Sequence, residues 1–188
     1  MKNTSAPVRI VITGSESTGK TALTAALAEV FSCPFSDEAA RIYVEEQRRA
    51  LNASDVEPIA RRQIDLETNA IQKADRMVIH DTDLWSTVVY AEHYYGKASD
   101  WLVRTASSRA ADFYLLCDID LPWIHEPLFR DQGSDAQRTN MHERFVNRLE
   151  HEALRWAMVT GIGEVRVRQA VDLVQQFFDQ ASLSKSSR

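Results

Sequence analysis

Apolar residues recur along the chain in two alternating spacings. Short β-branched, aromatic or apolar runs predict strands at residues 8–13, 32–36, 76–80, 112–117 and 157–160. Between these runs, apolar residues at helical spacing predict helices at 19–31, 38–51, 54–73, 84–95, 100–109, 141–156 and 165–178. Strands that are separated by helices pair in parallel through right-handed crossovers. The sequence therefore predicts a three-layer α/β fold with a mainly parallel, five-stranded sheet.

The length of 188 residues fits one domain, with its core at about residues 8–178. Residues 118–140 show little periodicity and contain two prolines and a glycine. An aperiodic loop of this length inside a compact domain is usually functional or disordered, and we interpret residues 122–140 as a lid. The composition of residues 179–188 predicts a disordered tail.

Charge and cysteine content exclude several classes of function. Lys and Arg number 22 against 27 Asp and Glu, giving a net charge of −5, which argues against a nucleic-acid partner. Cys33 and Cys117 lack metal-binding spacing and are interpreted as reduced, buried thiols. No apolar stretch approaches the length of a membrane span or a signal sequence, so we expect a cytoplasmic protein without a membrane partner.

The motif that carries chemistry is GSESTGKT, between the first predicted strand and the first predicted helix. It matches G-x-x-x-x-G-K-[ST] in full, and its residues are Gly14, Ser15, Glu16, Ser17, Thr18, Gly19, Lys20 and Thr21. Its glycines allow backbone N–H groups to converge on phosphate oxygens at a helix N-terminus. Lys20 is expected to reach the β- and γ-phosphates, and Thr21 to place its hydroxyl on Mg²⁺. The motif predicts a P-loop NTPase fold that binds ATP with Mg²⁺, although it does not distinguish ATP from GTP.

Three carboxylates follow predicted strands at the same edge of the sheet. Asp81 is the first choice for anchoring Mg²⁺ or serving as a general base, and Asp83 is the second. Both aspartates could instead cap the helix that begins near residue 84. Glu38 lies at this edge, where open α/β sheets bind ligands, and Arg41 follows on the same helix face. The alternative for Glu38 is an ordinary carboxylate at a helix N-terminus.

The long loop and two tryptophans supply the remaining candidates. Arg130 and Arg138 suggest a lid that closes and stabilises charge on the transferring phosphoryl group; the alternative is a solvated loop. Trp85 and Trp123 could stack on a planar substrate, a role that would suit a cationic ring, or could simply pack. Trp156 fits the apolar stripe of the predicted helix 141–156 and is expected in the core.

Several segments together resemble the ribosylnicotinamide kinase domain of NadR-type NAD biosynthesis proteins. They are GSESTGKT, DEAARIY (37–43), IARRQ (59–63), HDTDLWSTVVY (80–90) and FYLLCDIDLPWIHEPLFRD (113–131). The resemblance covers about residues 8–178. It is more specific than a P-loop alone, because it includes DTDL after the third strand and DLPW before an arginine-bearing lid.

The resemblance implies ATP-dependent phosphorylation of the 5′-hydroxyl of nicotinamide riboside, which yields nicotinamide mononucleotide and ADP. It places Glu38 and Arg41 on the substrate side and implies that Asp81 and Asp83 are the metal or base carboxylates. It also implies that the loop 161–168, which includes Arg166, lies near adenine. Two alternatives remain open from the residues: a kinase for another nucleoside or small metabolite, and a nucleotide-dependent regulatory ATPase.

Overall fold

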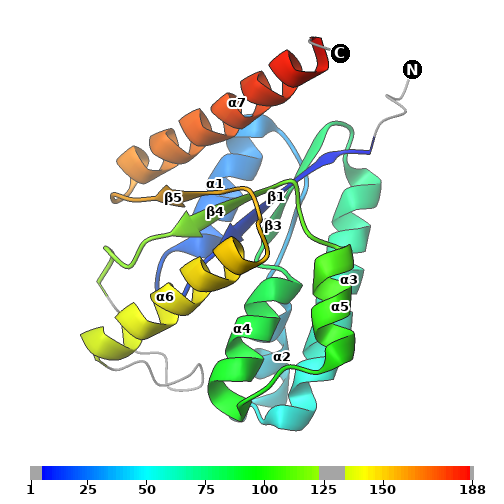
Figure 1. Ribbon diagram of the computed structural model, residues 1–188, viewed down its shortest axis with the longest axis vertical. Coiled ribbons are helices and arrows are strands. Elements are labelled where there is room, and N and C mark those ends of the chain that lie inside the picture. Colours follow the sequence, from blue (N-terminus) through cyan, green and yellow to red (C-terminus); the bar gives the residue numbers. More distant parts are fainter. Residues whose placement is uncertain (1–5, 123–133, 187–188) are drawn as a thin grey trace.

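The structure, a computed structural model, describes residues 6–122 and 134–186. In this part of the chain five strands form one sheet in the order β2-β3-β1-β4-β5, and every pairing is parallel (Figure 1). The strands are β1 (Val8–Thr13), β2 (Phe35–Ser36), β3 (Met77–Asp81), β4 (Phe113–Cys117) and β5 (Trp156–Val159). The predicted α/β fold with a parallel sheet is confirmed.

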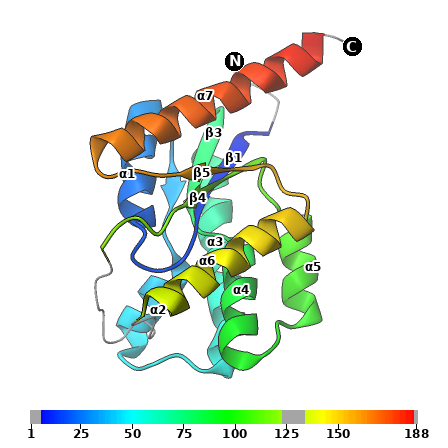
Figure 2. The same ribbon diagram turned by 60° about the vertical axis from the view of Figure 1, so that its left-hand side comes forward.

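Helices cover both faces of this sheet (Figures 1 and 2). Helices α1 (Lys20–Phe31) and α7 (Glu164–Ser186) pack on one face. The other face carries α3, α4, α5 and α6, and α2 packs against α3. These elements are α2 (Ala39–Gln47), a short 3-10 helix (Ala53–Asp55), α3 (Val56–Lys73), α4 (Leu84–Tyr95), α5 (Asp100–Ser108) and α6 (Asp135–His151).

The central strand β1 explains why there are two cores. Successive side chains of a strand point to opposite faces of the sheet. Ile10 and Ile12 are buried in the cluster formed with α1 and α7, whereas Val11 is buried in the cluster formed with α4 and α6. A fully buried parallel strand of this kind is apolar on both faces, which is the pattern of the run VRIVIT.

Parallel pairing brings the carboxyl ends of the strands to one edge of the sheet. Ile12 of β1 is in register with Asp81 of β3, Thr13 of β1 with Leu116 of β4, and Ser36 of β2 with His80 of β3. The segments that follow these strands therefore meet at this edge, which is where open α/β sheets bind ligands. They include the glycine loop and the residues around Asp81 and Glu38.

The segment predicted as a lid is partly helical. Helix α6 begins at Asp135, six residues before the predicted start, because Ser134 and Gln137 form a reciprocal capping box at its N-terminus. Arg138 is therefore a helix residue rather than a loop residue. Arg130 and Trp123 lie outside the described residues, so their predicted roles remain predictions.

Two further predictions at the C-terminal side are corrected. Trp156 begins strand β5 and pairs with Tyr114, so it does not belong to the preceding helix. Helix α7 runs to Ser186, so the predicted disordered tail is wrong for residues 179–186. This stretch contains neither glycine nor proline, and an existing helix therefore continues through it at little cost.

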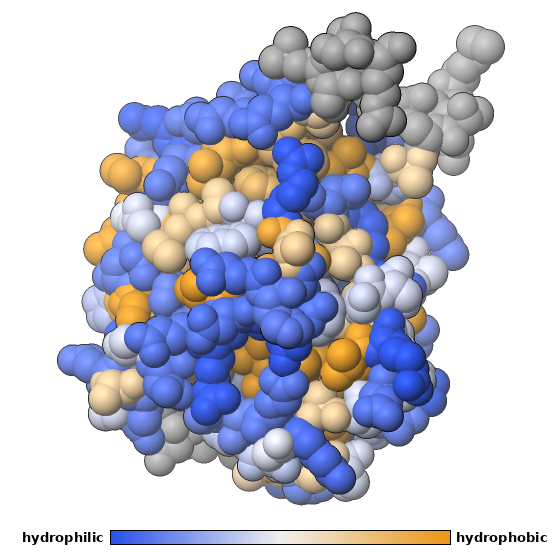
Figure 3. Space-filling view, viewed as in Figure 1, coloured by the Kyte–Doolittle hydropathy of each residue, from blue (hydrophilic) through white to orange (hydrophobic). Residues whose placement is uncertain are grey.

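The face of the molecule seen in Figure 3 is mainly polar. In the view of Figure 3 hydrophilic residues cover most of the molecule, and apolar residues show as smaller areas between them. Among the described residues the exposed large apolar side chains are those of Val30, Phe35, Ile162 and Val165. None of the helices described here has both the length and the apolar character needed to cross a membrane.

Candidate active site

The glycine loop between β1 and α1 adopts the geometry of an anion-binding loop. Gly14 has φ +133°, and a Cβ atom there would lie 2.9 Å from the carbonyl oxygen of Cys117, so only glycine fits. Gly19 has φ +76° and precedes α1, whose N-terminus has no side-chain cap. The Nζ of Lys20 and the Oγ1 of Thr18 both donate to the carbonyl oxygen of Ser15 at 2.8 Å, which closes the loop. An uncapped helix N-terminus at the end of a closed loop is suited to bind phosphate.

Thr21 and Asp81 meet beside this loop. The Oγ1 of Thr21 donates to Asp81 Oδ2 at 2.6 Å, whereas Asp81 Oδ1 is buried and accepts no hydrogen bond from the described residues. Burial, and then the negative charge of Glu38, raise the pKa of Asp81 to about 6, while Lys20, the hydrogen bond from Thr21 and the charge of Arg41 oppose the shift. The structure thus brings together the predicted pair Thr21 and Asp81.

This pair fits the oxygen chemistry of Mg²⁺. Magnesium in phosphoryl-transfer sites is usually held by one or two protein oxygens, substrate phosphates and water. A hydroxyl beside a carboxylate with one uncommitted buried oxygen meets that requirement. Among the residues placed by the structure, no three His, Cys, Asp or Glu side chains cluster as metal ligands.

Asp83 faces a different part of the molecule. It is the N-cap of α4: its Oδ1 accepts from the backbone N–H groups of Trp85 at 3.0 Å and Ser86 at 3.4 Å. Its Oδ2 accepts from the hydroxyl of Tyr114 at 2.8 Å. Burial raises the pKa of Asp83, and these hydrogen bonds oppose the shift. Both oxygens hold the fold together, so the geometry favours the capping alternative over a catalytic role.

The charges of Glu38 and Arg41 act on the pKa of Asp81, which the first raises and the second lowers. Glu38 is the N-cap residue of α2, but its side chain makes no capping hydrogen bond. The cap comes from Gln63 of α3, whose Oε1 accepts from the backbone N–H of Ala39 at 2.9 Å. The carboxylate of Glu38 is therefore not required by its own helix.

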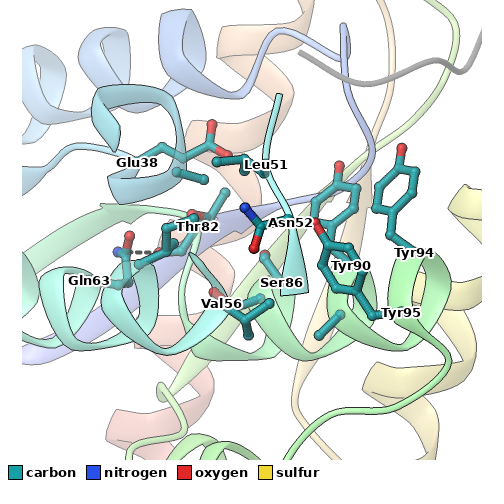
Figure 4. Close-up of a pocket in the computed structure, with 14 residues that line it drawn as sticks. Glu38, Leu51, Asn52, Val56, Gln63, Thr82, Ser86, Tyr90, Tyr94 and Tyr95 are labelled. Carbon is teal, nitrogen blue, oxygen red and sulfur yellow. Dashed lines mark hydrogen bonds between the residues drawn. The ribbon is translucent and has the colours of Figure 1, made fainter. Parts of the chain in front are cut away.

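A small pocket of about 40 Å³ opens next to Glu38, between α2, α3 and α4 (Figure 4). This volume is well below the roughly 300–1,000 Å³ of common ligand pockets, so a nucleoside could enter only if the surrounding side chains move. Glu38, Gln63 and Thr82 lie at one end of it, and Tyr90, Tyr94 and Tyr95 lie at the other. The rings of Tyr90 and Tyr94 are stacked, with centroids 6.2 Å apart and an interplanar angle of 10°. The pocket therefore combines a carboxylate with a wall of aromatic rings.

Two arginines, Arg138 predicted as a lid residue and Arg166 predicted near adenine, bind protein groups in the segment after β4. Arg138 is buried and its Nη2 donates to the carbonyl oxygens of Ile119 at 3.3 Å and Leu121 at 2.9 Å. Arg166 is also buried and donates to the carboxylate of Asp120 at 2.6 Å, and it further donates to the carbonyl oxygens of Gly161 and Asp118. We call residues 118–121, which these arginines hold from two helices, the strap. A Cβ at Gly19 would lie 2.8 Å from Leu121 Cδ1, so the strap packs directly on the glycine loop.

The predicted stacking role of Trp85 does not fit the structure. Its side chain is 2% exposed and belongs to the core cluster on the α4 and α6 face of the sheet. The guanidinium of Arg148 lies 5.4 Å from the centre of its ring. A buried ring with a cation already on its face cannot stack on a substrate without moving.

The pocket tyrosines and Gln63 are the site residues that the sequence prediction missed. Tyr90 and Tyr94 are four residues apart on a helix, a spacing that places them on one face. That spacing is also typical of core residues, so it does not by itself indicate a pocket. Gln63 belongs to IARRQ, one of the segments that carry the resemblance. Its hydrogen-bond partners are residues 39 and 82, which only the fold brings next to it.

Comparison with known proteins supports the resemblance. The chain is 26% identical over 176 residues to the trifunctional NAD biosynthesis/regulator protein NadR of Escherichia coli K12, a match that covers 91% of this chain and 43% of that protein. The NadR protein of Salmonella typhimurium LT2 is 25% identical over the same length. The chain thus spans less than half the length of these relatives.

Solved structures show the same similarity. The crystal structure of NadR protein in complex with NR superposes with a TM-score of 0.77 at 26% identity, covering 92% of this chain and 52% of that one. Thymidylate kinase from Ehrlichia chaffeensis, at 13% identity and a TM-score of 0.67, shares the fold over 90% of this chain. A family model described as an AAA domain matches residues 9–166. The chain therefore belongs to the AAA domain family.

Proposed function

We propose that this protein is an ATP-dependent kinase that phosphorylates the 5′-hydroxyl of nicotinamide riboside, forming nicotinamide mononucleotide and ADP. The phosphate-binding loop, the Thr21–Asp81 pair and the shared fold with NadR and thymidylate kinase support a phosphotransferase. The similarity to NadR, which has been crystallised with NR, supports a nucleoside acceptor.

The observation that carries the proposal is the charge of the pocket beside Asp81. Among the described residues that line it there is one carboxylate, Glu38, and no Lys, Arg or His. A nucleoside monophosphate acceptor would bring two negative charges close to Glu38, and such a site would need cations to hold them. A nucleoside carries no phosphate, and a pyridinium base gains from a carboxylate and from aromatic faces. The charge and the aromatic rings of the lining therefore favour a cationic, planar nucleoside.

Different residues would bind the phosphates, hold the metal ion and accept the proton. Lys20 and the backbone N–H groups of the glycine loop bind the ATP phosphates. Thr21 and Asp81 would hold Mg²⁺, which supplies positive charge to the phosphates when it is bound. Glu38 lies in the pocket lining, and we assign to it the acceptance of the hydroxyl proton as the ribose oxygen attacks the γ-phosphorus. The bond from that phosphorus to the bridging oxygen breaks, and ADP leaves.

The test is ADP release from Mg-ATP across a panel of acceptors. The panel contains nicotinamide riboside, nicotinic acid riboside, adenosine, uridine and thymidine, with nicotinamide mononucleotide as the matched phosphorylated control. We expect nicotinamide riboside to give the strongest stimulation and nicotinamide mononucleotide to give none, because the latter has no free 5′-hydroxyl and adds negative charge.

Each other outcome contradicts part of the proposal. Stimulation by a different nucleoside alone keeps the kinase but rejects the cationic acceptor. Slow ATP hydrolysis that no acceptor stimulates rejects the kinase and favours the regulatory ATPase.

A further inference from the structure

The two carboxylates of the site, Glu38 and Asp81, come from different elements that no strand pairing holds together directly. The last register pair between β2 and β3 is Ser36 with His80, and Glu38 lies two residues beyond the end of β2. Asp81 is the last residue of β3, and Glu38 immediately precedes α2. The distance between the two carboxylates is therefore set by whatever ties the start of α2 to the turn after β3.

One side chain makes that connection. Gln63 lies in the middle of α3 and is 2% exposed. Its Oε1 accepts from the backbone N–H of Ala39, the residue after Glu38, at 2.9 Å. Its Nε2 donates to the backbone carbonyl of Thr82, the residue after Asp81, at 3.3 Å, which is the dashed line in Figure 4. The oxygen and the nitrogen of one buried amide thus bind the residues that follow Glu38 and Asp81.

The turn that Gln63 holds is in an unfavourable backbone conformation. Thr82 has φ +64°, in the left-handed region that β-branched residues rarely adopt. Its N–H donates to the carbonyl oxygen of Ile12 at 3.0 Å, and its own carbonyl receives the Gln63 hydrogen bond. Such conformations persist only where surrounding contacts enforce them, and they cluster at functional sites. This turn directs Asp81 towards Thr21 and Asp83 towards the N-terminus of α4.

Gln63 also changes what Glu38 can do. An N-cap side chain ordinarily satisfies an N–H of the first helical turn. Here Gln63 accepts from the first N–H of α2 in its place, and the side chain of Glu38 makes no capping hydrogen bond. The carboxylate lines the pocket instead.

We propose that Gln63 is a positioning residue that fixes the separation of Glu38 and Asp81, by hydrogen bonding to the residue that follows each of them. The expected effect on kcat rests on the proposed function, whereas the expected effect on the two backbone segments does not. Gln63 touches neither the ATP phosphates nor the acceptor hydroxyl in this role. It acts on the reaction through the two carboxylates.

The test compares Gln63→Met with Gln72→Met. Methionine has a similar length and volume but makes neither hydrogen bond, and Gln72 is an exposed residue on the same helix. Amide hydrogen exchange without any substrate reports local opening of individual segments. We expect faster exchange in Q63M at both 37–42 and 80–84, and unchanged exchange in Q72M.

The kinetic part uses the best acceptor of the wild-type protein. Misplacing catalytic groups by about 1 Å can cost roughly 100-fold in rate, so we expect Q63M to lower kcat by about 10-fold or more. The Kd for ATP measured without Mg²⁺ should stay within about twofold, because Gln63 does not contact the glycine loop that binds the phosphates. A merely structural residue would instead lower stability and leave the kcat of the folded protein unchanged.

Several results would overturn the inference. The first is hydrogen exchange in Q63M that is unchanged at 37–42 or at 80–84. The second is faster exchange at both segments with a kcat equal to that of Q72M. If Q63M does not fold, Gln63→Asn takes its place: its amide is one methylene shorter and cannot reach both Ala39 and Thr82, so at least one of the two segments should loosen, with a loss of kcat. If the wild-type protein shows no acceptor-dependent transfer, the proposed function fails, and hydrogen exchange alone decides whether Gln63 positions the two segments.

Discussion

Asp81 and Asp83 are separated by one residue, yet they serve different parts of the molecule. Asp81 meets the hydroxyl of Thr21 at the phosphate-binding edge, and Asp83 caps α4 and accepts from Tyr114. Thr82, with its positive φ, is what turns the two carboxylates apart. Replacing Asp81 and replacing Asp83 are therefore expected to affect different properties of the protein.

We predict that Asp81→Ala loses activity and Asp83→Ala loses stability. Removing Asp81 takes away the carboxylate beside the phosphates and should lower kcat by roughly 100-fold or more, a loss typical of a lost electrostatic contact. Removing Asp83 deletes a helix cap, at about 1 kcal/mol, and leaves the buried Tyr114 hydroxyl without its acceptor, at about 1–3 kcal/mol. Urea unfolding and acceptor-dependent ADP release measure both quantities for each variant. An inactive Asp83→Ala protein with wild-type stability would show that the assignment is reversed.

At the level of elements, the strap joins three parts of the fold. Arg138 reaches it from α6 and Arg166 from α7, and Leu121 of the strap rests on Gly19 of the phosphate-binding loop. Elements that are far apart in sequence thus share one short segment at the site. Changes in α6 are expected to reach the glycine loop through the strap.

We predict that Arg138→Met destabilises the protein and weakens Mg-ATP binding. The substitution leaves the carbonyl oxygens of residues 119 and 121 without their donor, which should cost about 1–3 kcal/mol of unfolding free energy. Arg144→Met, an exposed change on the same helix, is the control. Thermal unfolding with and without Mg-ATP measures both effects. A lid arginine that acts only on the transferring phosphoryl group would behave differently, lowering kcat with stability and nucleotide affinity intact.

How far the sequence predicts the site depends on whether the signal is local. The glycine loop is contiguous, so its residues and its place between a strand and a helix follow from the motif alone. Arg138 lies in α6 and not in a loop because Ser134 and Gln137 form a capping box, and the two residues of that box are visible in the sequence. The direction of Asp83 depends on the backbone of Thr82, which no side-chain pattern reveals. The pocket needs three helices that only the tertiary fold brings together.

For the whole molecule, one buried acid links stability to pH. Glu67 of α3 is 1% exposed and lies 3.1 Å from the guanidinium of Arg109 and 3.6 Å from that of Arg9. Burial, and then the negative charge of Asp83, raise its pKa to about 7, and the two arginines oppose the shift without cancelling it. The folded protein therefore binds this proton more tightly than the unfolded chain does.

We predict that stability falls as pH rises from about 4.5 to 7 because of this group. Its contribution is fully present below the unfolded pKa and is lost as pH passes through the folded pKa. A shift from 4.5 to about 7 corresponds to about 3 kcal/mol at most. Glu67→Gln cannot titrate, so the difference in unfolding free energy between the two proteins should change by that order across this range. Urea titrations at several pH values measure it, and a constant difference would exclude Glu67 as the source.

The position of β1 at the centre of the sheet has a consequence for synthesis of the protein. This strand is made before its neighbours β3 and β4, which follow much later, and Ile10 pairs with Phe113. At about 5–20 residues per second, the intervening chain takes on the order of 5–20 s to make. During that time a β-branched, apolar run has no strand to pair with, and such runs aggregate when exposed. The strand that positions the phosphate-binding loop is thus exposed to aggregation while the rest of the sheet is being made.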